Sequence, residues 1–232
     1  MHAIILAAGR GERMRPLTDT IPKPLLEVGG KPLIQYHVEG LARAGVREIV
    51  INLAWLGSRI RQTLGDGAGF GVRIVYSDEG DAALETAGGI RKALPLLGNA
   101  PFLLANADVW TDYPYEQLRR YAGAGLGTAG HDLAHIVMVS NPRQHVRGDF
   151  ALEGDRVVTS QVNTYTYAGV GVYTAAFFAD CPPGPAKLIE PLRAAIQARR
   201  LSGELYGGRW FDVGTPQRLA EVDRIVRSLT SG

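Results

Sequence analysis

Short apolar segments of strand length alternate with helical patterns through the first half of the chain. The strand patterns cover residues 3–8, 48–53, 72–76 and 101–105, and the helical patterns cover residues 32–44, 56–64 and 86–95. This alternation predicts an α/β fold with a mostly parallel sheet and helices on both of its faces. Ligands of such sheets lie at the carboxyl ends of the strands. We therefore expect Gly9, Glu79 and Asp108, which each follow a strand, to meet at one edge.

The second half of the chain is less regular. We expect strands at residues 135–140, 164–173 and 209–213, and a hairpin whose turn is formed by residues 153–155. We expect helices at residues 188–200 and from residue 216 onward. Residues 123–134 are rich in glycine and alanine, which predicts a surface loop. No internal repeat is visible. We therefore predict a single domain, residues 1–232, built of two lobes, residues 1–112 and 113–232.

A loop rich in glycine, proline and cations follows the first strand. Gly9 and Gly11 suit a sharp turn and a close approach to a ligand. Arg13 and Lys23 come next, and prolines disfavour an α-helix here: Pro16, Pro22 and Pro24. Such a loop favours phosphate binding through backbone N–H groups and cations, with a cationic surface loop as the alternative. It is not the dinucleotide fingerprint, because Met14 stands at the third glycine, and the P-loop sequence is absent.

The composition narrows the class of partner. The chain has 232 residues, with 25 Lys and Arg against 23 Asp and Glu, so its charge is nearly balanced. This balance does not favour a nucleic-acid or membrane partner. Cys181 is the only cysteine, which excludes an internal disulfide and a cysteine zinc cluster. No apolar run has transmembrane length and the first residues lack a signal-peptide layout, so we expect a cytoplasmic protein.

Two aspartates stand at strand ends. Asp108 follows the apolar strand at 101–105, and Asp212 lies in the strand at 209–213. A carboxylate facing a phosphate loop suits Mg²⁺, which takes oxygen ligands and is often shared with substrate phosphates. The alternative is a turn in which the aspartate caps the following helix.

The glycine-rich loop is part of a longer motif. It reads Gly9-x-Gly11-x-Arg13-Met14-x-Pro16-Leu17-Thr18 and continues with Pro22-Lys23-Pro24-Leu25. This motif resembles the signature of the sugar-1-phosphate nucleotidylyltransferases, which join a nucleoside triphosphate to a sugar 1-phosphate and release pyrophosphate. Over nearly the whole chain, later segments resemble the branch of uridylyltransferases that act on N-acetylmuramate α-1-phosphate in peptidoglycan recycling. The resemblance implies a Rossmann-like three-layer fold of the nucleotide-diphospho-sugar transferase type, with a mixed, mostly parallel central sheet.

The same resemblance assigns roles to residues. Arg13, Lys23 and Asp108 are implied to be catalytic, with Arg13 on the triphosphate and Lys23 bridging the reacting phosphates. Asp108 and Asp212 are implied to hold a catalytic Mg²⁺ together. Residues 1–112 are implied to bind the nucleotide and residues 113–232 the sugar. The implied nucleotide-binding residues are Ala8, Gly9, Gly11, Arg13, Lys23, Glu79 and Thr86.

Glu79 is the candidate for reading the base. A carboxylate only accepts hydrogen bonds, so it suits uracil N3–H or guanine N1–H and N2–H, and adenine poorly. UTP and GTP therefore both remain open as substrates. The alternative is that Glu79 belongs to a solvated acidic loop.

The implied sugar-binding residues are Asn106, Arg147, Gly148 and Lys187. Arg147, or alternatively His145, is placed to meet the lactyl carboxylate that distinguishes muramate from glucosamine. Lys187 aligns with a lysine that contacts the sugar phosphate in the family. The alternatives are a basic surface turn for Arg147 and a solvated lysine at a helix start for Lys187.

Three functions remain open from the sequence. The first is uridylyl transfer to N-acetylmuramate α-1-phosphate, and the second is guanylyl transfer to mannose or heptose 1-phosphate. The third is a nucleotide-sensing module without catalysis, which the joint presence of Arg13, Lys23, Asp108 and Asp212 disfavours. We expect a monomer or a weak homodimer. His37 and the three tryptophans, Trp55, Trp110 and Trp210, are expected to be core residues rather than ligands.

Overall fold

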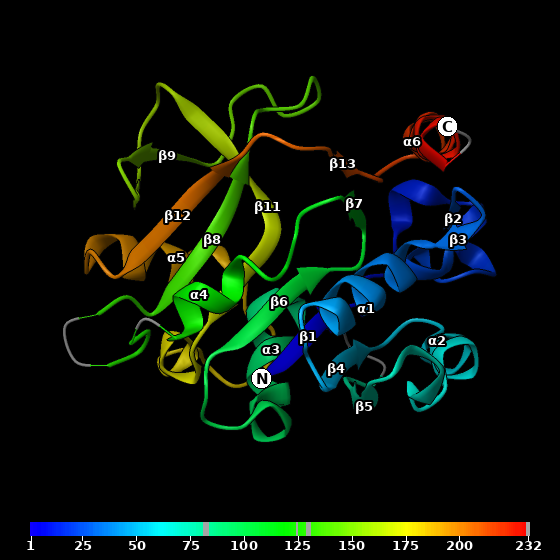
Figure 1. The fold of residues 1–232 in the computed structure, drawn as a ribbon, viewed down its shortest axis with the longest axis horizontal. Coiled ribbons are helices and arrows are strands. Elements are labelled where there is room, and N and C mark those ends of the chain that lie inside the picture. Colours follow the sequence, from blue (N-terminus) through cyan, green and yellow to red (C-terminus); the bar gives the residue numbers. More distant parts are fainter. Residues whose placement is uncertain (81–83, 124, 129–130, 231–232) are drawn as a thin grey trace.

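The computed structural model describes residues 1–80, 84–123, 125–128 and 131–230. One nine-stranded sheet runs through the molecule in the order β5-β4-β1-β6-β11-β8-β12-β10-β9 (Figure 1). Its strands are β1 (His2–Leu6), β4 (Glu48–Leu53), β5 (Arg73–Asp78), β6 (Phe102–Asn106), β8 (Ala134–Val139), β9 (Phe150–Glu153), β10 (Arg156–Val158), β11 (Thr164–Tyr173) and β12 (Leu201–Tyr206). The helices are α1 (Leu33–Arg43), α2 (Gly57–Leu64), α3 (Glu85–Leu97), α4 (Leu118–Gly123), α5 (Ile189–Gln197) and α6 (Pro216–Thr230).

The sheet is mixed, and the expectation of a mostly parallel sheet was wrong for its second half. The neighbours β5, β4, β1 and β6 are all parallel. β11 then runs antiparallel to β6, β8 and β9, and β12 restores a parallel pairing with β8. Helical crossovers link the first four strands, whereas hairpin and loop connections between later strands reverse the chain direction.

Helices pack on both faces of this sheet because alternate strand residues point in opposite directions. Ala3 and Ile5 of β1 belong to a buried cluster with side chains of α1, α2 and α4. Ile4, between them, belongs to a second cluster with side chains of α3 and α5. The near-continuous apolar sequence of β1 follows from its burial on both faces.

Several boundaries differ from the sequence expectations. The helix expected at residues 188–200 ends at Gln197, and the strand β12 that follows was not predicted. Its sequence, LSGELY, carries Gly203 and Glu204 and gives little strand signal; six pairs with β8 form the strand. The loop expected at 123–134 follows the unpredicted α4, and residues 124, 129 and 130 of it lie outside the described residues.

Two short ribbons stand outside the main sheet. β7 (Val109–Thr111) pairs with β13 (Trp210–Asp212), which is the strand expected at 209–213. β2 (Glu27–Val28) pairs with β3 (Lys31–Pro32), just after the glycine-rich loop. The final helix α6 returns to lie against this second ribbon (Figure 1). Asp223 of α6 accepts a hydrogen bond from the Gly29 N–H at 2.7 Å, so the chain's last helix is attached to its first forty residues.

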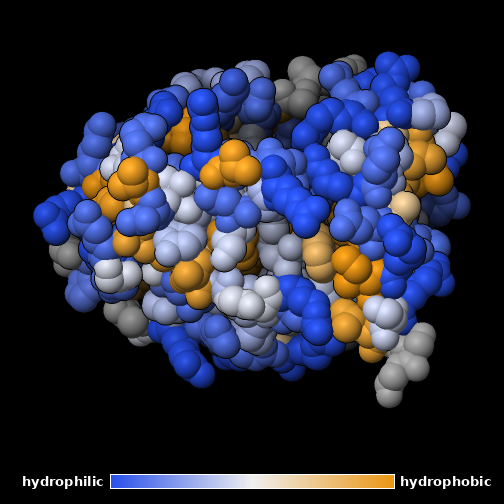
Figure 2. Space-filling model, turned by 90° about the horizontal axis from the view of Figure 1, so that it is seen from above, coloured by the Kyte–Doolittle hydropathy of each residue, from blue (hydrophilic) through white to orange (hydrophobic). Residues whose placement is uncertain are grey.

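The surface is mixed in character. On the face shown in Figure 2, hydrophobic residues form small groups separated by hydrophilic ones. Among the described residues, no helix is both long enough and apolar enough to cross a membrane.

Candidate active site

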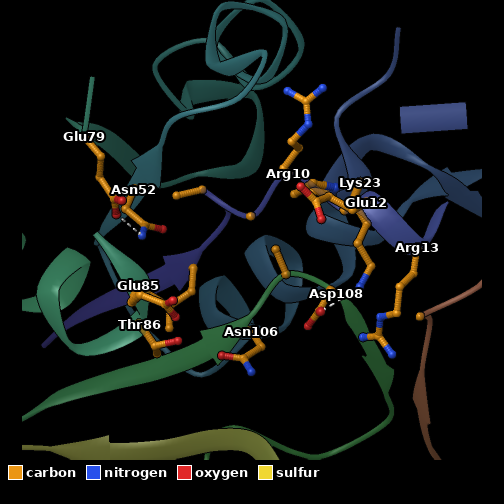
Figure 3. Close-up of a pocket in the computed structure, with 17 residues that line it drawn as sticks. Arg10, Glu12, Arg13, Lys23, Asn52, Glu79, Glu85, Thr86, Asn106 and Asp108 are labelled. Atoms are coloured by element: carbon orange, nitrogen blue, oxygen red, sulfur yellow. Dashed lines mark hydrogen bonds and ion pairs between the residues drawn. The ribbon is translucent and has the colours of Figure 1, made fainter. Parts of the chain in front are cut away.

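A cavity of about 510 Å³ opens at the carboxyl ends of β1, β4, β5 and β6. In Figure 3 the cationic loop residues stand on one side of it, and Asn52, Glu79, Glu85 and Thr86 stand on the other. Its lining contains every residue expected to bind the nucleotide: Ala8, Gly9, Gly11, Arg13, Lys23, Glu79 and Thr86. Asn106 and Asp108 line it as well.

The glycine-rich loop folds into three short 3₁₀ turns rather than an α-helix: Glu12–Met14, Leu17–Asp19 and Lys23–Leu25. Gly11 has a φ of 69°, in the left-handed region that glycine tolerates best. A Cβ at Gly11 would also lie 3.1 Å from side-chain atoms of Lys23 and Thr18. The Thr18 hydroxyl donates to the Gly11 carbonyl at 2.9 Å, which closes the loop on itself. Glycine is therefore required where the loop passes close to Lys23.

Trp55 anchors this loop from outside, which corrects the expectation of a plain core residue. Its indole N–H donates to the Thr18 carbonyl at 2.9 Å. The Arg10 guanidinium lies 3.9 Å from the centroid of its ring, in a cation–π contact. Trp110 is buried as expected, and Trp210 is half-buried.

Lys23 and Asp108 form the central ion pair of the cavity. The Lys23 ammonium lies 2.7 Å from Asp108 Oδ2, and the Lys23 residue is only 7% exposed. Asp108 occupies the turn between β6 and β7. A buried lysine needs a charged partner, and here the partner is an aspartate whose side chain remains 41% exposed toward the cavity.

The β7–β13 ribbon brings Asp212 beside Asp108 from far along the sequence. Asp212 pairs with Val109 across the ribbon, and the next residue, Val213, donates its N–H to the Asp108 carbonyl at 3.1 Å. Both aspartates line a second cavity of about 220 Å³, which also contains Asn106. Arg218 of α6 donates to Asp212 Oδ2. Each aspartate is thus paired with its own cation.

The two carboxylates suit a hard divalent cation. Mg²⁺ is commonly bound by one or two carboxylates together with substrate phosphates, so a complete protein cage is not needed. The described residues contain no cluster of three or more acidic, histidine or cysteine side chains able to hold an ion.

Glu79 is not a solvated loop residue, because it is 7% exposed and both of its carboxylate oxygens accept hydrogen bonds. Asn52 Nδ2 donates to Oε1 at 2.6 Å, and the Leu84 N–H donates to Oε2 at 2.8 Å. Asn52 Oδ1 in turn accepts from the Ala7 N–H at 2.7 Å. This chain of bonds joins β1, β4, β5 and the start of α3 on the side of the cavity opposite Lys23.

Asn52 was not among the residues predicted for the site. Its signal in the sequence was a single amide near the end of the apolar strand EIVINL. A polar side chain buried in such a strand needs hydrogen-bond partners. Arg10, Glu12 and Glu85 also line the first cavity and were not proposed. Arg218 was missed because its relation to Asp212 depends on how α6 begins.

The sugar-side candidates are divided between different cavities. His145 lines the small cavity that contains Asp108 and Asp212. Arg147 and Gly148 instead line a separate cavity of about 860 Å³. The His145 ring lies 2.9 Å from Asp149 Oδ1, while Asp149 Oδ2 accepts from the Tyr167 N–H at 2.9 Å. Asp149 therefore holds His145 on the side of the catalytic candidates.

Lys187 does not line either cavity that contains Asp108. It is exposed, and it follows Ala186, whose carbonyl accepts the Ala87 N–H at 2.8 Å. The segment containing Lys187 is therefore attached to the first turn of α3, which also carries Thr86.

His37 is a core residue, as expected. It is 1% exposed, with one ring nitrogen 2.6 Å from the Tyr115 hydroxyl and the other 2.8 Å from the Val109 carbonyl. Burial lowers the pKa of His37 to about 4, so the ring is neutral near pH 7. Its hydrogen bond to the Val109 carbonyl supports the β6–β7 turn.

The fold and site together define an α/β protein with a cavity at its strand ends, lined by a glycine-rich cationic loop and by Asp108, with Asp212 in the neighbouring cavity. Residues 2–145 match the family described as "Nucleotidyl transferase", and the chain belongs to this family. It is an enzyme of that family, as the sequence motif predicted.

Individual relatives extend the likeness over the whole chain. The chain is 49% identical to an N-acetylmuramate alpha-1-phosphate uridylyltransferase of Neisseria meningitidis serogroup B, over 97% of this chain and 98% of the relative. It is 34% identical to a protein of the same name from Caulobacter vibrioides, over 97% of both chains. A mannose-1-phosphate guanyltransferase of Kluyveromyces lactis is 41% identical, but over 55% of this chain and 37% of the relative.

Solved structures share the fold. A putative glucose-1-phosphate thymidylyltransferase from Bacillus anthracis superposes with a TM-score of 0.87 at 21% identity, covering 98% of this chain and 96% of that one. A UDP-glucose pyrophosphorylase complexed with UDP-glucose superposes with a TM-score of 0.79 at 20% identity, covering 98% of each chain.

Proposed function

We propose that this enzyme transfers a uridylyl group from UTP to N-acetylmuramate α-1-phosphate, with Mg²⁺, and releases pyrophosphate. The observation that carries the proposal is the 49% identity to a uridylyltransferase of that name over nearly the full length of both chains. The geometry agrees, because two cavities that share Asn106 and Asp108 hold between them the glycine-rich loop, a buried lysine and the two aspartates. We assign the fold to the three-layer, nucleotide-diphospho-sugar transferase type, and we propose that the enzyme acts in the cytoplasm, within peptidoglycan recycling.

The proposed reaction is a direct displacement at phosphorus. A phosphate oxygen of the sugar 1-phosphate forms a bond to the α-phosphorus of UTP, and the bond from that phosphorus to the pyrophosphate oxygen breaks. No protein nucleophile is needed, and Cys181, the only cysteine, lies in the buried cluster with α3 and α5. The enzyme contributes positioning and neutralisation of charge.

The residues of the cavity divide this work. Gly9 and Gly11 let the loop backbone approach the triphosphate, and Arg13 and Lys23 supply positive charge. Asp108 and Asp212 would hold Mg²⁺, which when bound neutralises charge on the phosphates. Lys23 is already held in place by Asp108, so its ammonium is preorganised beside the reacting groups.

Glu79 supports base recognition in this proposal. Its two oxygens each accept one hydrogen bond within the protein, and each retains a further lone pair for the base. Uracil N3–H and guanine N1–H both fit such an acceptor. The preference for UTP therefore rests on the likeness to the uridylyltransferases.

A panel of substrates tests the proposal. Pyrophosphate release is measured for UTP and GTP, each with N-acetylmuramate, N-acetylglucosamine or mannose 1-phosphate. UTP with N-acetylmuramate α-1-phosphate is expected to give the highest kcat/KM. A higher value for GTP with mannose 1-phosphate would overturn the proposal and favour the guanylyltransferase, which the partial match to mannose-1-phosphate guanyltransferases makes the second candidate. No turnover in any combination would favour the non-catalytic nucleotide-sensing module.

We propose that the lactyl carboxylate of the sugar is read by His145, with Arg147 tested in parallel. His145 lines the cavity of Asp108 and Asp212, whereas Arg147 lines a separate one. A charge-assisted hydrogen bond contributes on the order of 1.5–3 kcal/mol, or about ten- to a hundredfold in specificity. His145→Ala is therefore expected to lower the preference for muramate over glucosamine phosphate about tenfold or more.

The measurement is the ratio of kcat/KM for the two sugar phosphates in wild type and in both variants. Arg147→Ala is expected to leave the ratio nearly unchanged. A large change in Arg147→Ala with none in His145→Ala would return the role to Arg147, and no change in either would remove this loop from sugar selection.

A further inference from the structure

Arg218 occupies an unusual position beside the two aspartates. Its Nη1 donates to Asp212 Oδ2 and lies 3.4 Å from the Asp212 backbone carbonyl. The Asp212 and Arg218 side chains are 25% and 21% exposed, so water screens this pair only in part. Arg218 engages Oδ2, and Asp212 also lines the cavity shared with Asp108.

The backbone between these residues lies close to the ion pair. A Cβ built on Gly214 would lie 3.2 Å from both Asp212 carboxylate oxygens and 3.3 Å from Arg218 Nη1. Arg218 lies in the first turn of α6, whose Val222 and Val226 are buried in a cluster with Trp110 and Val213. The packing of α6 thus anchors the backbone from which the Arg218 side chain reaches Asp212.

The two cations of the site differ in this respect. Lys23 sits in the loop that we propose binds the triphosphate, and its ammonium has three N–H donors, so it can donate to phosphate while Asp108 holds it. Arg218 is held on α6 and, together with Asp212, lines a cavity that does not contain Lys23 or Asp108. When substrate arrives, Lys23 has a new partner available, whereas Arg218 keeps Asp212.

We propose that Arg218 is a resident counter-ion that weakens divalent-cation binding at Asp212 while the substrate is absent. This inference rests on the proposed role of Asp108 and Asp212 in holding the metal. Two adjacent carboxylates without cations would repel each other and would attract a free divalent ion. With Arg218 and Lys23 in place, that charge is already neutralised. Tight metal binding then requires the additional negative charge of the triphosphate, so metal and nucleotide bind cooperatively.

Mn²⁺ binding to the substrate-free protein, followed by electron paramagnetic resonance, tests the inference. Arg218→Met removes the charge and keeps most of the side-chain volume, and it is expected to tighten Mn²⁺ binding on the order of tenfold. Arg218→Gln, which keeps a donor without the charge, is expected to do the same and serves if the methionine variant folds poorly. Arg218→Lys, which keeps the charge, is expected to bind Mn²⁺ as wild type does.

Two further variants locate the effect. Arg224→Met removes an exposed arginine from the same helix and is expected to change nothing. Adding Asp212→Asn to Arg218→Met is expected to abolish the gain. Unchanged Mn²⁺ affinity in both charge-removing variants, or a gain that survives Asp212→Asn, would overturn the inference.

Thermal unfolding gives an independent readout. The melting temperature of Arg218→Met is expected to be lower in EDTA than in Mn²⁺, because in EDTA its carboxylates lack a counter-ion. Wild type is expected to show a smaller difference between the two conditions. Suppose that wild-type turnover requires Mg²⁺ and Asp212, but Arg218→Met changes neither the Mn²⁺ affinity nor the difference in melting temperature. The inference about Arg218 then fails, while the proposed metal role of Asp212 stands. If Asp212→Asn leaves metal-dependent turnover intact, the proposed metal role fails with it.

Discussion

At the scale of single residues, the site depends on charges that lie close together and are only partly exposed. Lys23 is almost fully buried, yet its partner Asp108 remains open to the cavity. The sequence indicated Asp108 because it follows a strand, and strand ends of parallel neighbours meet at one edge. It indicated Lys23 because this residue is one of the cations of the glycine-rich loop. The roles of Asn52 and Arg218 were not predicted, because tertiary packing brings these residues to their partners Glu79 and Asp212.

Lys23→Ala is expected to lower kcat about 10²–10³-fold, because a preorganised cation beside the reacting phosphates is lost. The cost in unfolding free energy is expected to be about 1 kcal/mol or less, since Asp108 is 41% exposed and remains hydrated. Steady-state kinetics and urea denaturation measure the two effects.

Matched variants separate charge from packing. Lys23→Met keeps the aliphatic stem and should lose as much turnover as the alanine variant. Lys31→Met removes a lysine that pairs with Glu39 outside the cavity and should retain activity. A loss of less than tenfold in correctly folded Lys23→Ala would remove Lys23 from the proposed role.

At the scale of helices and strands, the sequence pattern predicted the elements of the first half well and those of the second half less well. The first half consists of strands buried on both faces and amphipathic helices, which give strong periodic signals. The missed strand β12 has a glycine and a glutamate at its centre, and its form depends on β8. The β7–β13 ribbon is likewise a product of long-range pairing, although its second strand was expected.

The contact of α1 with β7 makes stability depend on pH. Burial lowers the pKa of His37 to about 4, below an ordinary value of about 6.5. The unfolded chain therefore binds a proton more readily than the folded one, and the stability contribution of neutral His37 is complete above about pH 6.5 and is lost as pH falls toward 4. Between pH 7 and pH 5 this contribution should fall by about 2 kcal/mol.

Urea denaturation at the two pH values measures this change. His37→Gln cannot take up the proton, so its loss of stability between pH 7 and pH 5 should be smaller than that of wild type by about this amount. His131→Gln, at an exposed position, should behave as wild type. Equal pH dependence in wild type and His37→Gln would show that the buried ring does not resist protonation.

At the scale of the whole molecule, the active site is assembled from both ends of the chain. The loop after β1 supplies the residues proposed to contact phosphate, the β6–β7 turn supplies Asp108, and the segment before α6 supplies Asp212. α6 then packs against the β2–β3 ribbon that follows Lys23, so the two ends support each other. The predicted division into lobes 1–112 and 113–232 stays a prediction, and α6 contacts the first of them. The expected monomer or weak homodimer likewise stays a prediction.

The central claim is that Asp108 and Asp212 serve one ion and one reaction, although they lie far apart in the sequence. A double-mutant cycle on kcat tests it most directly, using Asp108→Asn, Asp212→Asn and the double variant at saturating Mg²⁺. Residues that act as a unit are strongly non-additive. The double variant is therefore expected to be little slower than the slower single variant. If the two losses multiply instead, the aspartates have separate roles and the account of a shared metal site is contradicted.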